Sequence, residues 1–144
     1  MINVSPGAWT VILDHLKAAY PKEGCGLLLG AEGAAGGARE VTVALPSTNV
    51  YEGDQKDRFL VDPRVQIQAM KIEREQGLAV LGVFHSHPDE DAYFSTTDRE
   101  NTWSFYSNIV VSIRRREFAG AKCFRVNEDR TEAFPEDLSF DKSR

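Results

Sequence analysis

Apolar residues recur at helical spacing in two segments of the chain. The first segment follows Ser5 and Pro6, which are typical of a helix N-cap and of the first helical position, and it ends before Pro21. The second begins at Pro63 and ends at Gly77, and glycine at such a place commonly terminates a helix. The pattern therefore predicts one helix in each segment.

Shorter apolar runs predict β-strands between and after these helices. Residues 25–29 and 40–45 are separated by a Gly- and Ala-rich turn at 30–38, so we expect an antiparallel hairpin. Residues 78–84 are continuously apolar, which is typical of a buried central strand. The remaining predicted elements are a mobile polar loop at 50–56, a strand at 58–61, a polar loop at 88–94, a third helix from Ser95 to about Ser107, and strands at 109–113 and 121–126.

Length and composition limit the class of protein. A chain of 144 residues that is 42% hydrophobic can build one core, so we expect one domain over residues 1–138 and a loose charged tail at 139–144. The net charge of -5, with scattered Lys and Arg residues, argues against a nucleic-acid partner. Residues 1–14 lack the features of a secretory signal and no apolar run is long enough to span a bilayer, so we expect a cytoplasmic protein without membrane association.

The two cysteines, Cys25 and Cys123, lie far apart in sequence. They could form a disulfide, but a chain with an ordinary core does not need one, and buried free thiols are the expected state. Cys25 follows Glu23 by two positions and so lies on the same face of a strand. A sulfur ligand or a redox role for Cys25 is therefore an alternative to a simple core position.

Two histidines end the predicted central strand. Because strand side chains alternate between faces, His85 and His87 project to the same side and can converge on one metal ion. Asp98, eleven residues after His87, could add a carboxylate oxygen, and zinc accepts this mixture of ligands. The segment Ser95 to Asp98 has a second interpretation, a helix capping box in which the acidic side chain bonds to the chain's own amides.

These residues form part of a longer pattern. The sequence His85-Ser86-His87-Pro88 is followed by Ser95 and Asp98, and upstream the segment 23–30 begins with Glu23 and continues as a Gly-rich apolar run. This arrangement resembles the motif of the JAMM (MPN+) zinc metalloprotease family, in the form found in its short bacterial single-domain members. One departure is Phe94, where many relatives carry proline; it removes no ligand.

The resemblance implies a fold and a site. The fold would be α/β, a curved mixed β-sheet flanked by helices in an MPN (JAMM) domain that is cytidine-deaminase-like. His85, His87 and Asp98 would bind one Zn²⁺ per chain with water as the fourth ligand. Glu23 would be the general base that activates the water and passes its proton to the leaving amine, and Ser95 would stabilise the charged intermediate.

The resemblance also implies a peptidase or isopeptidase that cleaves after the C-terminal Gly-Gly of a ubiquitin-like or sulfur-carrier protein. The main alternative is a non-catalytic MPN-type scaffold that binds proteins. A zinc deaminase would need a His-x-Glu and a Pro-Cys-x-x-Cys pattern, and the sequence has neither. Ser86 as a nucleophile with an adjacent histidine fails because neighbouring strand residues face opposite sides. The sequence leaves the oligomeric state open.

Overall fold

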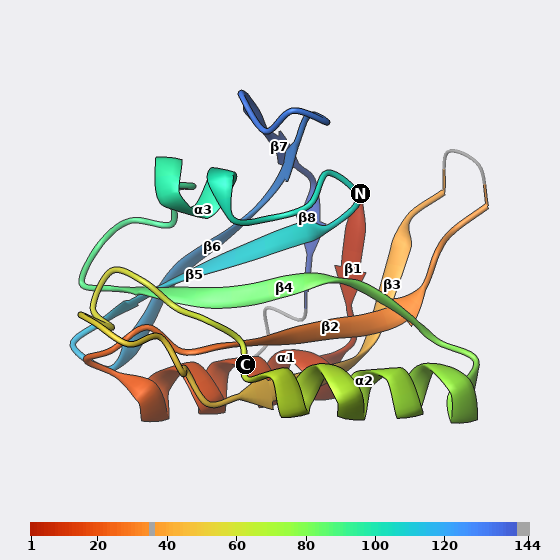
Figure 1. The fold of residues 1–144 in the computed structure, drawn as a ribbon, viewed down its shortest axis with the longest axis horizontal. Helices are drawn as coiled ribbons and strands as arrows, with labels where there is room; N and C mark the ends of the chain where they lie inside the picture. The colour runs from red at the N-terminus through yellow and green to blue at the C-terminus, as the bar shows by residue number, and fades with distance from the viewer. Residues whose placement is uncertain (35–36, 141–144) are drawn as a thin grey trace.

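The computed structural model describes residues 1–34 and 37–140, and these form a mixed β-sheet with helices on both of its faces (Figure 1). The helices are α1 (Pro6–Ala19), α2 (Pro63–Gln76) and α3 (Thr96–Glu100). The strands are β1 (Ile2–Val4), β2 (Cys25–Ala31), β3 (Arg39–Ser47), β4 (Ala79–Pro88), β5 (Ser107–Arg114), β6 (Glu117–Val126), β7 (Ala133–Glu136) and β8 (Leu138–Ser139).

The strands follow the order β7-β6-β5-β4-β2-β3-β1-β8. β4 pairs in parallel with β5 and antiparallel with β2, so it lies near the middle of the sheet. β7 and β8 occupy opposite edges although only Asp137 separates them in the chain, and Ile2 donates its N–H to the Asp137 carbonyl at 2.8 Å. The sheet must therefore curl until its edges approach, which agrees with the predicted curved mixed sheet.

Each face of the sheet carries its own hydrophobic cluster. The α1 face buries Trp9, Ile12 and Leu16 against Leu28, Phe84 and residues of β5. The opposite face buries Cys25, Leu27 and Leu29 of β2 with Ala69 of α2. Because β2 side chains alternate between these clusters, both faces of the central strands are fixed by apolar burial. The exit ends of the strands can then hold polar side chains in defined positions.

Several predicted elements are confirmed. Ser5 caps α1 by accepting a hydrogen bond from the Ala8 N–H, and Gly77 ends α2 in the left-handed conformation with φ 66°. β2 and β3 form the expected antiparallel hairpin. The predicted apolar strand is the first part of β4, which continues through His85 and His87 to Pro88. The strands β1, β7 and β8 were not predicted, since each has four residues or fewer.

The third helix is much shorter than predicted. α3 ends at Glu100, and β5 already begins at Ser107, the residue where the helix was expected to end. Asn101 stops it by donating from Nδ2 to the Thr97 carbonyl at 2.7 Å, which satisfies a carbonyl that another helical turn would have used. The side chain of Thr102 then bonds to Asn108 Oδ1 at 2.8 Å, which ties the following turn to β5.

The predicted strand at 58–61 is wrong. Its only sheet-like contact among the described residues is an isolated bridge between Val61 and Asn49. The loop at 50–56, predicted to be mobile, contains hydrogen bonds of its own: Gln55 Nε2 donates to the carbonyls of Asn49 and Tyr51 at 3.0 and 2.9 Å. The His15 side chain of α1 is half-buried, and its Nε2 lies 3.0 Å from the Ser47 carbonyl.

The end of the described chain joins the fold. Ser139 pairs with Asn3, and the ring of Phe140 stacks on Trp9 with centroids 4.1 Å apart. Residues 141–144 of the expected tail, and residues 35–36 of the Gly- and Ala-rich turn, lie outside the described residues. Over the described ranges, no helix has the length and apolar character needed to cross a membrane. Both cysteines are free and buried, as expected.

Candidate metal centre

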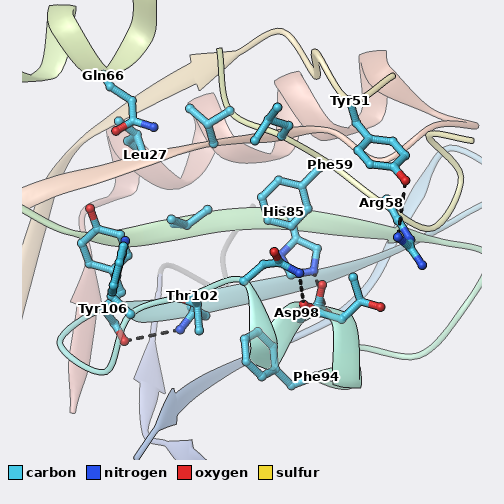
Figure 2. Close-up of a pocket in the computed structure, with 17 residues that line it drawn as sticks. Leu27, Tyr51, Arg58, Phe59, Gln66, His85, Phe94, Asp98, Thr102 and Tyr106 are labelled. Carbon is cyan, nitrogen blue, oxygen red and sulfur yellow. Dashed lines mark hydrogen bonds and ion pairs between the residues drawn. The ribbon is translucent and has the colours of Figure 1, made fainter. Parts of the chain in front are cut away.

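The exit end of β4 brings two imidazoles to one point. His85 and His87 are buried, and their Nε2 atoms lie 3.3 Å apart. The Asp98 Oδ2 atom lies 3.3 Å from each of the two Nε2 atoms. Figure 2 shows Asp98, from α3, pointing at His85 on β4. Residues from two elements thus form a compact triangle of donor atoms, the cluster on which a metal ion could bind.

The spacing of this triangle fits zinc. Ligand atoms about 2.0–2.1 Å from a tetrahedral ion lie about 3.3–3.4 Å from one another. The three donor atoms here are each separated by 3.3 Å, and their nitrogen and oxygen chemistry is that of many zinc sites. A tetrahedral ion bound to them would keep one position open.

Asp98 serves the helix cap and the cluster together. Its Oδ2 accepts from the Ser95 N–H at 3.1 Å, while Ser95 Oγ accepts from the Asp98 N–H at 2.9 Å, so the predicted capping box is present. The two interpretations of this segment are therefore compatible, because the cap orients the carboxylate toward the histidines. Burial alone would raise the pKa of Asp98, but His85, His87 and the Ser95 amide outweigh it and hold the pKa well below its usual range.

Neighbouring groups orient both imidazoles. His87 Nδ1 lies 3.0 Å from the Asp91 carbonyl, an acceptor that requires the proton on Nδ1 and leaves Nε2 free to bind a cation. Burial lowers the pKa of His87, but its contacts with Asp98 and Asp91 offset this and raise the pKa overall. The ring of Phe59 stacks on His85 with centroids 4.5 Å apart, which restricts rotation of that ring.

Glu23 lies two residues before β2, beside the cluster. β2 pairs with β4 so that Cys25 faces His85, and the same register continued by two residues places Glu23 opposite His87. Glu23 is only 3% exposed, and its Oε1 has no hydrogen-bond partner among the described residues. Burial, followed by the negative charges of Asp98, Asp57 and Glu90, raises the pKa of Glu23 to about 9. A buried carboxyl without a partner is costly, which favours a bound cation or water beside it.

Cys25 is not part of the donor cluster, although it faces His85. It is fully buried against Leu27, Leu29 and Ala69. Burial raises the pKa of its thiol to about 12, so the thiolate needed for metal binding is disfavoured. The core position that the sequence suggested for Cys25 therefore accounts for its surroundings.

Comparison with known proteins places this geometry in a family. Residues 5–127 match the family described as prokaryotic homologs of the JAB domain, Prok-JAB, and this range contains all five predicted site residues. The chain belongs to this family. It is a JAMM/MPN family member, as the motif indicated, and its curved sheet with flanking helices is the MPN domain fold.

The names of two similar proteins agree with this assignment. The chain is 33% identical over 116 residues to a desampylase from Haloferax volcanii, covering 77% of this chain and 80% of the relative. It is 36% identical over 90 residues to a probable TtuB-protein conjugate cleaving protease from Thermus thermophilus, covering 62% of this chain and 55% of that protein. This member of the family is a hydrolase of the JAMM type.

Among solved structures, a Desulfitobacterium hafniense protein superposes with a TM-score of 0.81 at 29% identity and covers 98% of this chain and 93% of its own. A JAB1/MPN domain protein from Archaeoglobus fulgidus superposes with a TM-score of 0.54 at 18% identity, covering 99% and 98%, and shares the fold.

A cavity of about 400 Å³ adjoins the donor cluster. Its lining includes Leu27 of β2, Val83 of β4, Phe59 and Trp103. Figure 2 shows His85 and Asp98 between the Tyr51 and Arg58 side of the cavity and the Gln66 and Tyr106 side. These lining residues were not predicted from the sequence, because they come from separate segments and share no spacing that marks them.

Three residues of the loop after β4 lie around the site in different ways. The Tyr93 ring packs against His87 with centroids 4.7 Å apart and is largely exposed, whereas Phe94 lines the cavity and stacks on Phe124. Ser95 is half-buried, and its hydroxyl accepts from the Asp98 amide. No acceptor for the Ser95 hydroxyl proton is found in the described part of the chain, so this proton is available to a ligand.

Proposed function

We propose that this protein is a zinc-dependent isopeptidase that cleaves after the C-terminal Gly-Gly of a ubiquitin-like or sulfur-carrier protein. The observation that carries the proposal is the triangle of His85, His87 and Asp98 donor atoms, each 3.3 Å from the others, beside the buried carboxyl of Glu23. The names of the two relatives, a desampylase and a protease of TtuB conjugates, support a conjugated carrier protein as the substrate class.

His85, His87 and Asp98 would hold one Zn²⁺ per chain and leave one position for water or substrate. A bound Zn²⁺ supplies Lewis acidity and makes water a better nucleophile near neutral pH. The Asp91 carbonyl and the Phe59 ring keep the two imidazoles in place, so the donor atoms need little rearrangement when the ion binds.

Glu23 is assigned as the general base, and Ser95 as a hydrogen-bond donor. The Glu23 carboxylate would take a proton from the attacking water and deliver it to the nitrogen of the leaving lysine or amino acid. The pKa of about 9 applies to the Glu23 carboxyl when no ion is bound. A nearby dication would lower this pKa, so the carboxylate would be ionised at neutral pH. The Ser95 hydroxyl would donate to the oxygen of the attacked carbonyl as negative charge develops there.

The cavity offers a place for the carrier's extended C-terminal tail. Leu27, Val83 and Trp103 line it, together with Phe94 and with Phe59, which stacks on His85. The aromatic rings in this lining would restrict bulky substrate side chains, so glycine at the two positions before the scissile bond would be favoured. The lining also contains polar side chains, such as Gln66 and Asn101, that could bond to the main chain of an extended tail.

A paired measurement tests this proposal. A carrier protein ending in Gly-Gly is joined to lysine through an isopeptide bond, and the same carrier is extended by a short peptide; each is incubated with zinc-loaded enzyme and followed by intact mass. We expect release directly after Gly-Gly, loss of at least about 10³-fold in rate for Glu23→Gln, and parental rates for Glu75→Gln, a control on the exposed side of α2. If Glu23→Gln cleaves the conjugate at the parental rate, Glu23 is not the general base.

Zinc content separates the enzyme from the scaffold alternative. After chelation, reloading and dialysis, the parent protein should retain one zinc per chain and Asp98→Asn should retain far less. A non-catalytic protein-binding scaffold would bind the carrier without cleaving it and would show no dependence on these side chains. Binding of the carrier with no cleavage in the zinc-loaded parent would support the scaffold and contradict the peptidase.

A further inference from the structure

Asn49, two residues after the end of β3, uses its entire side-chain amide in hydrogen bonds. Nδ2 donates to the carbonyls of Glu23 and Arg58, each at 3.0 Å. Oδ1 accepts from the N–H groups of Tyr51 and Leu60, each at 3.0 Å. An asparagine amide has two donor hydrogens and two acceptor sites, and all four are used here. A flipped amide would set its NH₂ group against N–H donors and its oxygen against carbonyl oxygens, so only one orientation fits.

The same loop also bonds to the backbone N–H of Glu23. Glu23 donates its N–H to the Gln55 carbonyl at 2.6 Å, and the Gln55 side chain donates to the carbonyls of Asn49 and Tyr51. Both main-chain polar groups of Glu23 are therefore bonded to the loop segment that Asn49 organises. Glu23 precedes β2, so this loop takes the place of sheet pairing in holding its backbone.

The loop held by Asn49 also forms one wall of the cavity. Tyr51, Arg58, Phe59 and Leu60 line it, and Phe59 stacks on His85 (Figure 2). Asn49 bonds directly to three of these four residues, through the Arg58 carbonyl and the Tyr51 and Leu60 amides. One side chain thus connects the backbone of the proposed base with the wall that the substrate tail would contact.

We propose that Asn49 is a positioning residue, which places the Glu23 carboxylate against the donor cluster and fixes the cavity wall formed by residues 51–60. This inference rests on the proposed function, because it needs Glu23 to be the base. A displacement of a reacting group by about 1 Å can lower a rate by about 10²-fold, so the loss of Asn49 acts on the chemical step without touching the substrate.

Two substitutions separate the effect of Asn49 on Glu23 from its effect on the cavity wall. Asn49→Ala removes all four bonds, so we expect kcat to fall at least about tenfold and KM for a carrier conjugate to rise several-fold. Asn49→Asp keeps the acceptor for Tyr51 and Leu60 but sets a carboxylate oxygen against the Glu23 and Arg58 carbonyls. We therefore expect Asn49→Asp to lower kcat more than it raises KM, because the wall loses its bond to Arg58 but keeps those to Tyr51 and Leu60. General loosening of the fold does not produce this split.

Asp54→Ala is the matched control. Asp54 Oδ1 accepts from the Lys56 N–H inside the same loop and has no bond to Glu23, so this variant should keep kcat and KM within about twofold of the parent. Hydrogen exchange of the metal-free protein supplies a readout independent of activity. The amides of Tyr51 and Leu60 should exchange at least about tenfold faster in Asn49→Ala and at the parental rate in Asn49→Asp and Asp54→Ala.

The outcomes are distinguishable. Folded Asn49→Ala or Asn49→Asp with parental kcat and KM would overturn the inference, as would unchanged exchange of the Tyr51 and Leu60 amides in Asn49→Ala. If Asn49→Ala does not fold, the inference is tested by Asn49→Asp alone, through the relative changes in kcat and KM. If the zinc-loaded parent cleaves no conjugate although exchange changes as expected, the proposed function fails while the tether from Asn49 to the loop remains supported.

Discussion

Cys25 lies directly opposite His85 where β2 and β4 pair, and its side chain is fully buried in the cluster beneath α2. The thiol is close to the proposed metal site in the sheet register but belongs to the apolar core. Its pKa, raised by burial to about 12, keeps it protonated at neutral pH. The closeness of Cys25 to His85 therefore reflects core packing and not metal coordination.

Cys25→Ala should leave zinc stoichiometry unchanged and lower the free energy of unfolding by roughly 1 kcal/mol, because a small buried side chain is lost. Zinc content after dialysis and urea unfolding of the loaded protein measure the two effects. A loss of bound zinc comparable to that of Asp98→Asn would show that the sulfur is a ligand after all.

Ser95→Ala separates the helix cap from catalysis. Losing the cap to the Asp98 amide should cost about 1 kcal/mol of stability, and losing the donor to the developing oxyanion should lower kcat by roughly 10²–10³-fold. Zinc should be retained, because the Asp98 carboxylate still accepts from the main-chain N–H of residue 95. Ser95→Thr keeps a hydroxyl and should recover most of the rate; if Ser95→Ala instead loses zinc, Ser95 acts only through Asp98.

Glu23 should make the metal-free protein less stable as the pH rises. Its pKa is about 9 in the folded chain against an ordinary value of 4.5, so the folded state holds the proton more tightly. The resulting stabilisation is complete below pH 4.5 and is lost as the pH approaches 9. Glu23→Gln cannot ionise, so between pH 5.5 and 8.5 its stability relative to the parent should improve by at least about 1 kcal/mol.

Thermal unfolding of the chelated parent and Glu23→Gln at both pH values measures this difference. The other titrating groups are common to the two proteins and largely cancel in the comparison. An unchanged difference between the two pH values would mean that the Glu23 carboxyl is solvated in solution. Added zinc should reduce the effect, because a nearby dication lowers the pKa of the carboxyl.

Trp103 should contribute to recognition of the carrier and not to the chemical step. It lines the cavity and is 55% exposed, with Arg130 packed over its ring at 5.5 Å. Trp103→Ala should raise KM for an intact carrier conjugate about tenfold and leave kcat within about twofold. Phe134→Ala is the control, since Phe134 is also exposed but does not line the cavity. Equal effects of the two substitutions would argue against a specific role for Trp103.

Local patterns in the sequence were sufficient for α1, α2 and the β2–β3 hairpin. Ser5, Pro6 and Gly77 act within one helical turn of the positions they mark, so their effects are visible without the rest of the fold. The extent of α3 was not predictable in this way. Asn101 ends the helix by bonding to the Thr97 carbonyl, and the following turn is held by the bond from Thr102 to Asn108, a contact that exists only once β5 is in the sheet.

By itself, the sequence determined which residues are candidates for the site, because alternation along one strand places His85 and His87 on one side and the spacing to Asp98 matches a known motif. Only the tertiary structure decided how buried Glu23 is, which loop holds its backbone, and which aromatic side chains line the cavity. The hydrogen bond from Asn49 to the Glu23 carbonyl joins residues 26 positions apart in the chain. The packing of the loop against the start of the sheet brings these residues together, and no local spacing in the sequence records it.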